Sequence, residues 1–492
     1  MIVKYPLLII VILSIVLRLP YLDGSFWMDE AAQALEVVRP FSQQLEISAD
    51  FQPPLLHLVL HLAQYFSHSE WFLRTIGALI PGIITIVYTY KIAKHLFSQK
   101  VATITGLLLA TSSFHIFFSQ ELRPYSLPAM LATLSMYFFL QAIEKKTKDD
   151  FIYLTLSNTL GLYASYLYPF FMLSQIAYIV CNKRLRKTKA FLNSFVISIL
   201  SFVPLLPIFL GQLEQGGIVR TTLPGWDQVV STPQLKAIPL VFGKLIFGVL
   251  PLDANFLIIT LSVLLFISGI AILHTLLKNS QKTQIQIVMY WIIVPVLTAW
   301  LISFIVPVVS PKRLLYILPG IYILCSYAFV ELYTSNFKKN IARFTLATVF
   351  IVNAIATTSY YVTAQLQREN WRTLHQQIHR EFKPTETLLV YSFINEFAPM
   401  AWYEQYETES FPKYATGVLH IDGVADLPNQ LKVAANYKTV LVFDYLRDLT
   451  DPERKIDTHL KELGFKQVGV LDYPNIGFVR IFMQPQAVIG YR

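Results

Sequence analysis

The sequence is poor in charged residues and in cysteine. Of its 492 residues only 14% are Asp, Glu, Lys or Arg, whereas 54% are hydrophobic. This balance excludes a soluble globular protein of that length and predicts a polytopic membrane protein. The two cysteines, Cys181 and Cys325, lie in or at the end of apolar stretches with no second Cys or His at ligand spacing. We therefore expect both to be buried small apolar side chains.

Several sequence motifs are also missing. The chain has no GxxxxGK[ST] and no GxGxxG after a predicted strand, which argues against a nucleotide-binding site. It has no repeat of fixed period and no heptads, so solenoids and coiled coils find little support. No small-residue cleavage site follows the first apolar run, which we interpret as a retained membrane span.

Long apolar stretches dominate what is present, and their lengths predict about eleven transmembrane helices. These stretches are residues 5–18, 74–94, 101–118, 125–143, 151–168, 169–181, 190–210, 254–275, 286–306, 314–334 and 341–361. Strongly basic loops alternate with less basic ones, so the positive-inside rule places the basic loops and the N-terminus in the cytoplasm. The net charge of +9 thus reports topology, and we expect no nucleic-acid partner. Two shorter apolar stretches, 53–66 and 238–250, are expected to be helices at the outer interface.

The composition changes after residue 361. Four stretches, "TLLVYSF", "YKTVLVFDYL", "FKQVGVLDY" and "IGFVRIFM", read as strands, and helices are expected near 370–381 and 453–463. The predicted organisation is therefore a mainly α transmembrane domain, 1–361, whose first outer loop is 19–73, followed by a soluble α/β domain, 362–492. The odd number of spans places the second domain outside the cytoplasm.

Three clusters of ionisable residues lie in outer loops. They are Asp29 and Glu30 in "FWMDEAAQAL", Glu121 and Arg123 in "FSQELRPYSL", and Lys312 and Arg313 in "SPKRLLYILPG". Taken singly, the acidic pair is also explained as the first turn of a surface helix, and the cations as anchors at lipid headgroups. Together they are typical of a site that combines a carboxylate for proton abstraction with cations for a phosphate.

Five stretches resemble, in order, the hallmarks of the GT-C fold membrane glycosyltransferases. They are "RLPYLDGSFWMDEAAQAL", "DFQPPLLHLVLHL", "FSQELRPYSL", "SPKRLLYILPG" and "ENWRTLHQQI". The nearest groups are the protein O-mannosyltransferases, the aminoarabinose transferases acting on lipid A and their bacterial homologues, and the resemblance covers residues 5–361 and the start of the tail. It implies an enzyme that moves a sugar from a polyprenyl-phosphate donor to an acceptor hydroxyl outside the cytoplasm, with inversion.

The resemblance also implies roles for single residues. Asp29 would be the general base, and Glu30 would orient the first-loop helix by pairing with Arg123. The donor phosphate would bind Lys312 and Arg313.

Supporting positions would be Glu121, Gln52 and His57. Many relatives have a histidine or an acidic residue just before the paired prolines, where this chain has Gln52, a poor metal ligand. His57 and Glu121 could complete a divalent site with Asp29, but we expect no obligatory metal or other cofactor.

Two other function classes stay open at this point. Ionisable residues in a membrane protein also mark the substrate path of a transporter or a lipid flippase. A receptor built around the tail would instead need a ligand cleft in residues 362–492. The expected location is the inner or plasma membrane, with membrane lipids and an acceptor glycan, lipid or protein as partners.

Overall fold

The structure is a computed structural model that describes residues 5–47, 51–222, 234–251, 255–334, 338–391, 398–405 and 426–485. The chain forms two compact units. We call residues 1–23, 40–215 and 227–366 the helical unit, and residues 24–39, 216–226 and 367–492 the α/β unit. The short segment 24–39, which contains the acidic pair, thus belongs to the same unit as the end of the chain.

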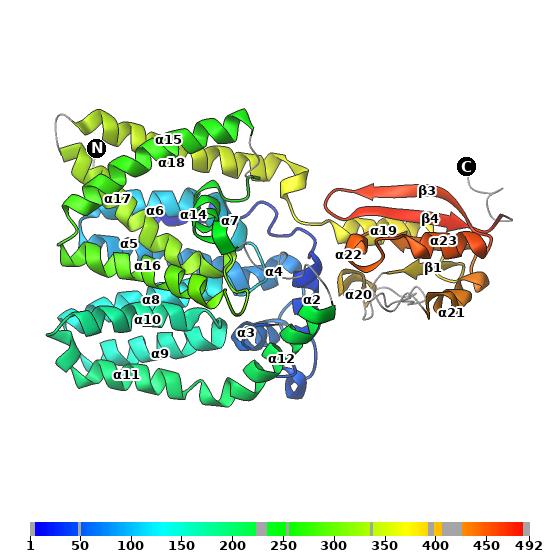
Figure 1. Cartoon of the computed structure of the whole chain (residues 1–492), viewed down its shortest axis with the longest axis horizontal. Coiled ribbons are helices and arrows are strands. Elements are labelled where there is room, and N and C mark those ends of the chain that lie inside the picture. Colours follow the sequence, from blue (N-terminus) through cyan, green and yellow to red (C-terminus); the bar gives the residue numbers. More distant parts are fainter. Residues whose placement is uncertain are drawn as a thin grey trace. The chain divides into compact units, whose positions relative to one another are not determined.

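The helical unit is a bundle of helices that run side by side (Figure 1). Its α-helices are α1 (Pro6–Val16), α3 (Leu55–Ala63), α4 (Glu70–Arg74), α5 (Ile80–Leu96), α6 (Gln99–Thr111), α7 (Ser113–Phe118), α8 (Ser126–Glu144), α9 (Lys148–Ala164), α10 (Tyr168–Cys181), α11 (Lys189–Leu200), α12 (Leu206–Thr222), α14 (Ala237–Phe247), α15 (Phe256–Lys278), α16 (Thr283–Ile302), α17 (Leu318–Thr334) and α18 (Lys339–Val362). A π-helical turn, η2 (Thr75–Leu79), links α4 to α5, and a 3-10 helix, η6 (Lys312–Ile317), leads into α17.

All eleven apolar stretches that the sequence singled out are largely helical, and the shorter ones contain α3 and α14. Within the described ranges, seven helical segments are long and apolar enough to cross a membrane, and α1 and α10 are shorter apolar helices. The mainly helical membrane architecture is confirmed, whereas the number of spans stays a prediction. The stretch 101–118 is divided because Ser112 leaves the helical region at ψ 117°.

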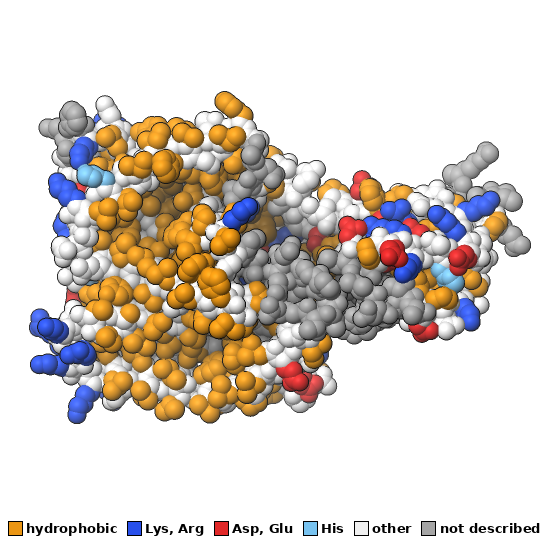
Figure 2. Space-filling view, in the orientation of Figure 1, with side chains coloured by type: hydrophobic (Ala, Val, Ile, Leu, Met, Phe, Trp, Pro, Cys, Tyr) orange, Lys and Arg blue, Asp and Glu red, His pale blue; other side chains and the backbone are white. Residues whose placement is uncertain are grey.

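Apolar surface covers the flank of the helical unit, while Lys and Arg gather at one end (Figure 2). Along α15, for example, Val263, Phe266 and Ile270 are more than half exposed. An apolar surface of that extent needs lipid around it. By contrast, most of α17 is buried within the bundle. The exposed Lys and Arg include those of the turns after α8 and α10, as the positive-inside pattern requires.

One expectation about burial is wrong. Cys181, at the end of α10, is exposed, and Cys325, within α17, is half-buried. A helix that is surrounded by lipid is apolar on the face that contacts lipid as well as on the face that packs inside the protein. Apolar neighbours in the sequence therefore do not predict burial inside the protein.

The α/β unit contains a four-stranded mixed sheet with the order β1-β2-β4-β3. Its strands are β1 (Thr387–Val390), β2 (Thr439–Phe443), β3 (Lys466–Tyr473) and β4 (Gly477–Met483). β1 and β2 are parallel, and β4 pairs antiparallel with both β2 and β3. The hairpin between β3 and β4 turns at Asn475 and Gly477, both at positive φ, which glycine and asparagine adopt readily. All four predicted strands are present.

The α-helices of this unit are α2 (Met28–Val37), α19 (Trp371–Glu381), α20 (Ala398–Glu404), α21 (Leu427–Leu431), α22 (Arg447–Thr450) and α23 (Lys455–Glu462). Side chains of α21 and α23 join Val440 and Val442 of β2 in one core cluster. Trp371 of α19 stacks on Phe443, with ring centroids 6.4 Å apart. Because side chains alternate along a strand, α19 lies on the opposite face.

Candidate functional site

In the helical unit the structure brings the second and third clusters together. Lys312 begins η6, and its Nζ lies 5.3 Å from the centroid of the Tyr125 ring. Arg313 follows, and its Nη1 donates hydrogen bonds of 3.3 Å to the backbone oxygens of Pro307 and Val308. Lys312 thus stands beside the start of α8, and Arg313 follows it on η6. Neighbouring cations of this kind are able to bind a phosphate.

Buried aromatic side chains hold the η6 turn through hydrogen bonds. Tyr316 Oη donates to the backbone oxygen of Leu167 at 3.2 Å, and Trp291 Nε1 donates to the backbone oxygen of Tyr316 at 3.0 Å. Both aromatic side chains are almost fully buried. The backbone that carries Lys312 and Arg313 is therefore held by the core, whereas their side chains are half-buried.

The loop with Glu121 and Arg123 is tightly folded. The backbone N–H of Arg123 donates to the backbone oxygen of Glu121 at 2.8 Å, and the backbone N–H of Tyr125 donates to the backbone oxygen of Arg123 at 2.7 Å. Glu121 is buried at 2% exposure, while Arg123 is half-buried. These backbone bonds fold the loop tightly just before Tyr125, whose ring lies beside Lys312 of η6.

Gln52 and His57 form a hydrogen-bonded pair. Gln52 Nε2 lies 3.0 Å from His57 Nε2, and both side chains are buried. The Gln52 amide thus lies within hydrogen-bonding distance of the imidazole Nε2. The Gln52 backbone oxygen also accepts from Gln212 Nε2 at 3.1 Å. The amide that replaces the relatives' histidine or acid therefore engages the imidazole nitrogen that could otherwise bind a metal.

In the α/β unit, Asp29 and Glu30 lie in the first turn of α2, as the sequence predicts. Glu30 is fully buried and Asp29 is half-buried. The residue before the helix, Trp27, is extended and makes no side-chain cap. Instead the Met28 N–H donates to Glu369 Oε2 at 3.2 Å, so a carboxylate from the far end of the sequence caps α2.

Glu369 is a functional candidate that sequence reasoning missed. It accepts hydrogen bonds from Trp371 Nε1 at 2.6 Å and from Tyr445 Oη at 2.7 Å. Burial raises the pKa of Glu369, hydrogen bonds oppose that shift, and the charge of Asp29 adds to it. Burial and the nearby carboxylates also raise the pKa of Tyr445. The only signal in the sequence was the position of Glu369 at the start of "ENWRTLHQQI". That motif does not indicate which residues Glu369 binds.

The segment just before α2 is bound by α19 and α20. Ser25 Oγ accepts from the Arg372 N–H at 3.0 Å and lies 3.0 Å from Tyr403 Oη. The Phe26 N–H donates to Tyr403 Oη at 2.9 Å, and the Phe26 ring meets Trp402 edge-on. The start of the acidic helix is thus positioned by the tail. Arg123 belongs to the helical unit, so its pairing with Glu30 stays a prediction.

Among the described residues, one group of His, Cys, Asp or Glu side chains could hold a metal ion. It consists of His375, His379 and Glu404, all in the α/β unit. It shares no member with the set that the sequence suggested for a divalent ion, which includes His57 and Glu121.

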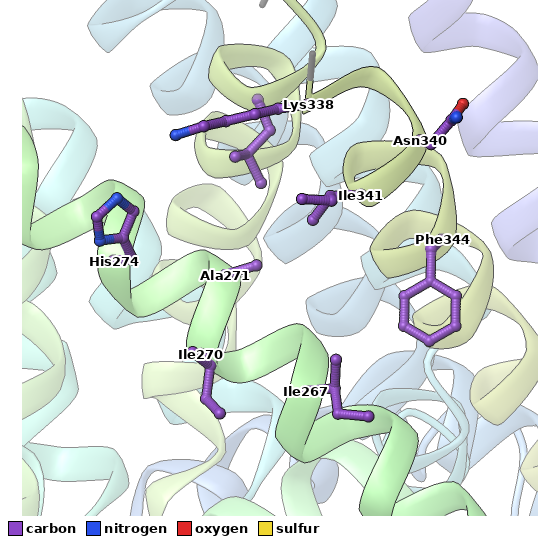
Figure 3. A pocket seen from close by; sticks show the side chains of 9 residues that line it. Ile267, Ile270, Ala271, His274, Lys338, Asn340, Ile341 and Phe344 are labelled. Atoms are coloured by element: carbon purple, nitrogen blue, oxygen red, sulfur yellow. The ribbon is translucent and has the colours of Figure 1, made fainter.

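A groove lies between α15, α17 and α18 (Figure 3). Ile267, Ile270, Ile341 and Phe344 line it, together with His274 and other residues. The four apolar side chains are each at least 40% exposed, so the groove belongs to the surface that lipid covers. It contains none of the residues in the three clusters.

Comparisons with known proteins bear on this arrangement. Residues 52–208 match a family model described as dolichyl-phosphate-mannose-protein mannosyltransferase. The sequence has no significant match among curated proteins. Among solved structures, ArnT from Cupriavidus metallidurans in the apo state has a TM-score of 0.57 at 11% identity, covering 98% of both chains. ArnT bound to undecaprenyl phosphate has the same TM-score at 10% identity and the same coverage.

A second group of similar structures comes from an archaeon. The Archaeoglobus fulgidus oligosaccharyltransferase tethered with an acceptor peptide has a TM-score of 0.54 at 13% identity. The match covers 97% of this chain and 74% of that one. The chain has the GT-C fold. The fold that the resemblance of the five motifs implies is thereby confirmed.

The match to the family model covers only part of the GT-C candidate site. Gln52, His57, Glu121 and Arg123 lie within residues 52–208. The acidic pair and the basic pair of η6 lie outside that range, so their roles rest on the sequence motifs and on the geometry described above.

Proposed function

We propose that the chain transfers a sugar from a polyprenyl-phosphate donor to an acceptor hydroxyl on the extracytoplasmic side of the membrane. One observation carries this proposal: the acidic and basic motifs of the sequence occur on a fold shared over 98% of the chain with ArnT. A structure of ArnT holds undecaprenyl phosphate. The Archaeoglobus oligosaccharyltransferase has been captured with an acceptor peptide and with dolichol phosphate.

The proposed reaction is a single inverting displacement. The acceptor oxygen attacks the anomeric carbon of the donor, its proton passes to the Asp29 carboxylate, and the bond from that carbon to the phosphate oxygen breaks. Polyprenyl phosphate leaves, and Lys312 and Arg313 stabilise the charge that develops on it. General base catalysis of this kind contributes about 10²-fold to 10⁴-fold. The donor ester already stores the free energy for transfer, so no nucleotide is needed at this step.

The geometry gives Glu369 a positioning role in this proposal. Its carboxylate caps α2 one residue before Asp29. Its charge also interacts with that of Asp29. Movement of Glu369 would therefore shift both the place and the electrostatic surroundings of the base.

The proposed topology has a cytoplasmic N-terminus, and residues 362–492 form a domain outside the cytoplasm. A C-terminal fusion to a reporter that is active only in the cytoplasm should be silent. Activity of that reporter would contradict the proposed side of the site.

The function is tested with purified full-length protein and a panel of polyprenyl-phosphate sugars carrying a radiolabel on the sugar. Loss of label from the lipid, with release of polyprenyl phosphate, is expected for one sugar in the presence of acceptor. Lys312→Ala with Arg313→Ala in one protein is the negative control. If the intact protein consumes no member of the panel while a transport assay moves an intact donor across vesicles, the transferase proposal is wrong.

A further inference from the structure

The α/β unit contains a compact group of metal-ligating side chains outside the proposed transfer site. His375 and His379 stand one turn apart on α19, and Glu404 is the last residue of α20. Residues four apart on a helix share a face, and here that face meets Glu404. The ligand atoms of all three residues lie within 4.8 Å of one another.

The donor atoms converge with spacings that suit a metal. Nε2 of His375 lies 3.1 Å from Oε2 of Glu404, and Nε2 of His379 lies 3.3 Å from the same oxygen. In a tetrahedral zinc site, bonds of about 2.0–2.2 Å place neighbouring donors roughly 3.3–3.6 Å apart, so small shifts of these side chains would suffice. We propose that His375, His379 and Glu404 bind a divalent transition-metal ion, with zinc the best match.

Burial supports a cation at this point. The side chains of His375 and Glu404 are only 2% and 8% exposed, and that of His379 is 16% exposed. Buried charged groups in proteins are usually paired or coordinate metals, and a divalent ion would balance this carboxylate. Two imidazole nitrogens and one carboxylate oxygen suit zinc, whereas calcium and magnesium prefer oxygen ligands alone. The competing arrangement has no metal, and Glu404 then accepts hydrogen bonds from both imidazoles.

The sequence around the histidines indicates a structural metal. In zinc peptidases with two histidines four apart, a glutamate directly follows the first histidine and acts as general base. This chain has Gln376 at that position, and an amide cannot accept the proton. The ion would therefore join α19 to α20 without a hydrolytic role.

A metal that links α19 to α20 would also affect α2. The importance of this effect rests on the function proposed above. Tyr403, next to Glu404, binds Ser25 and Phe26, and the Arg372 N–H at the start of α19 binds Ser25. Both helices that the metal would connect thus hold the segment that leads into α2. Metal binding would fix the helix that carries Asp29.

The test measures zinc in the full-length protein, purified without a histidine tag. After chelation and titration with zinc, the protein should bind one equivalent, and cobalt should give the intense visible absorption of a tetrahedral site. His379→Gln, the replacement at the most exposed ligand, should lower zinc affinity by about 10²-fold or more, since even outer-shell partners contribute 10-fold to 100-fold. Glu404→Gln should do the same.

His459→Gln provides a matched control. His459 Nδ1 lies 2.9 Å from Glu462 on α23 in the same unit, but that carboxylate is 65% exposed. Within the part of the chain that the structure describes, the pair belongs to no group of three metal-ligating side chains. This variant should keep one tight zinc. Because His375 is buried, His375→Gln is read only alongside its melting temperature.

The outcomes separate the two proposals. Absence of equimolar zinc and of a cobalt spectrum in the folded intact protein would overturn the metal site and leave the hydrogen-bonded group. Equimolar binding that survives both His379→Gln and Glu404→Gln would also overturn it. Zinc binding is measured without substrate, so failure of the transferase assay leaves this result intact. If zinc binds as expected but its removal leaves transfer by an active enzyme unchanged, only the link to α2 is wrong.

Discussion

Asp29→Asn separates a general base from a residue that merely stabilises a helix. The replacement keeps the volume and one oxygen of the side chain but removes the proton acceptor. If Asp29 is the base, the transfer rate should fall by about 10²-fold to 10⁴-fold, which corresponds to roughly 2.7–5.5 kcal/mol in the barrier. Binding of the donor lipid should be unchanged, because the cations assigned to its phosphate belong to other loops.

The structure predicts that the same change hardly affects stability. A negative charge in the first turn of a partly exposed helix contributes about 0.3–1 kcal/mol, and that term is lost. The loss is offset because Asp29 and the buried Glu369 repel each other when both are charged, and an interaction of this kind is worth a similar amount. The net change in the free energy of unfolding should therefore stay within about 1 kcal/mol.

The assay follows label leaving the donor lipid under single-turnover conditions, with the melting temperature of each protein measured in parallel. Asp23→Asn is the matched control, because Asp23 is an exposed carboxylate in the same loop that precedes α2. Glu30→Gln should lose less activity than Asp29→Asn, since Glu30 is assigned no proton transfer and a neutral amide can still hydrogen-bond to Arg123, its predicted partner. A folded Asp29→Asn protein with near-normal transfer would refute the assignment and leave the acidic pair as part of a surface helix.

Four further results are expected. Arg313→Ala, and to a smaller extent Lys312→Ala, should weaken donor binding by roughly 1.5–3 kcal/mol, because a phosphate loses a charge-assisted partner; unchanged apparent donor affinity in both would move the phosphate site elsewhere. Arg447→Met should destabilise the α/β unit by about 3–5 kcal/mol, because the fully buried guanidinium binds three Asp side chains and removing one partner of a buried ion pair is strongly destabilising. Among them Asp444, whose pKa burial alone would raise, has a lowered pKa because of hydrogen bonds and charge from Arg480 and Arg447. Its contribution is therefore present at neutral pH and lost in acid below its ordinary value of 3.8, and a flat acid profile of wild-type melting temperature would contradict this. Glu369→Gln should gain stability relative to the wild type as pH rises above 4.5, because burial raises the pKa of the Glu369 carboxyl in the folded chain. Equal pH profiles of the two melting temperatures would show that ionising this carboxyl does not destabilise the folded chain.

Much of the architecture could be predicted because it depends on local composition. An apolar stretch long enough to span lipid must be helical, since backbone groups in lipid have no water to bind. The four strands of the tail were predictable from β-branched and aromatic runs bounded by turn residues. The division of 101–118 at Ser112 was not predicted, because both halves are equally apolar.

The candidate site divides in the same way. The acidic pair, Arg123 and the basic pair of η6 were found from sequence because charges are rare in an apolar chain and therefore stand out. Glu369 was not found as the cap of α2, and neither was the convergence of His375 and His379 on Glu404. In a tail with ordinary composition, a charged or imidazole side chain does not by itself identify its partner.

The sequence by itself determined the membrane class, the helices and strands, and the residues that could carry acid, base and phosphate chemistry, because each follows from residue type and from spacing within a few turns. Only the tertiary structure decided which of these residues meet. Lys312 lies over Tyr125, and Met28 donates to Glu369 across 341 positions of sequence. Contacts of that kind are set by the packing of whole helices against one another. Packing depends on side chains from many elements at once, and no local pattern contains that information.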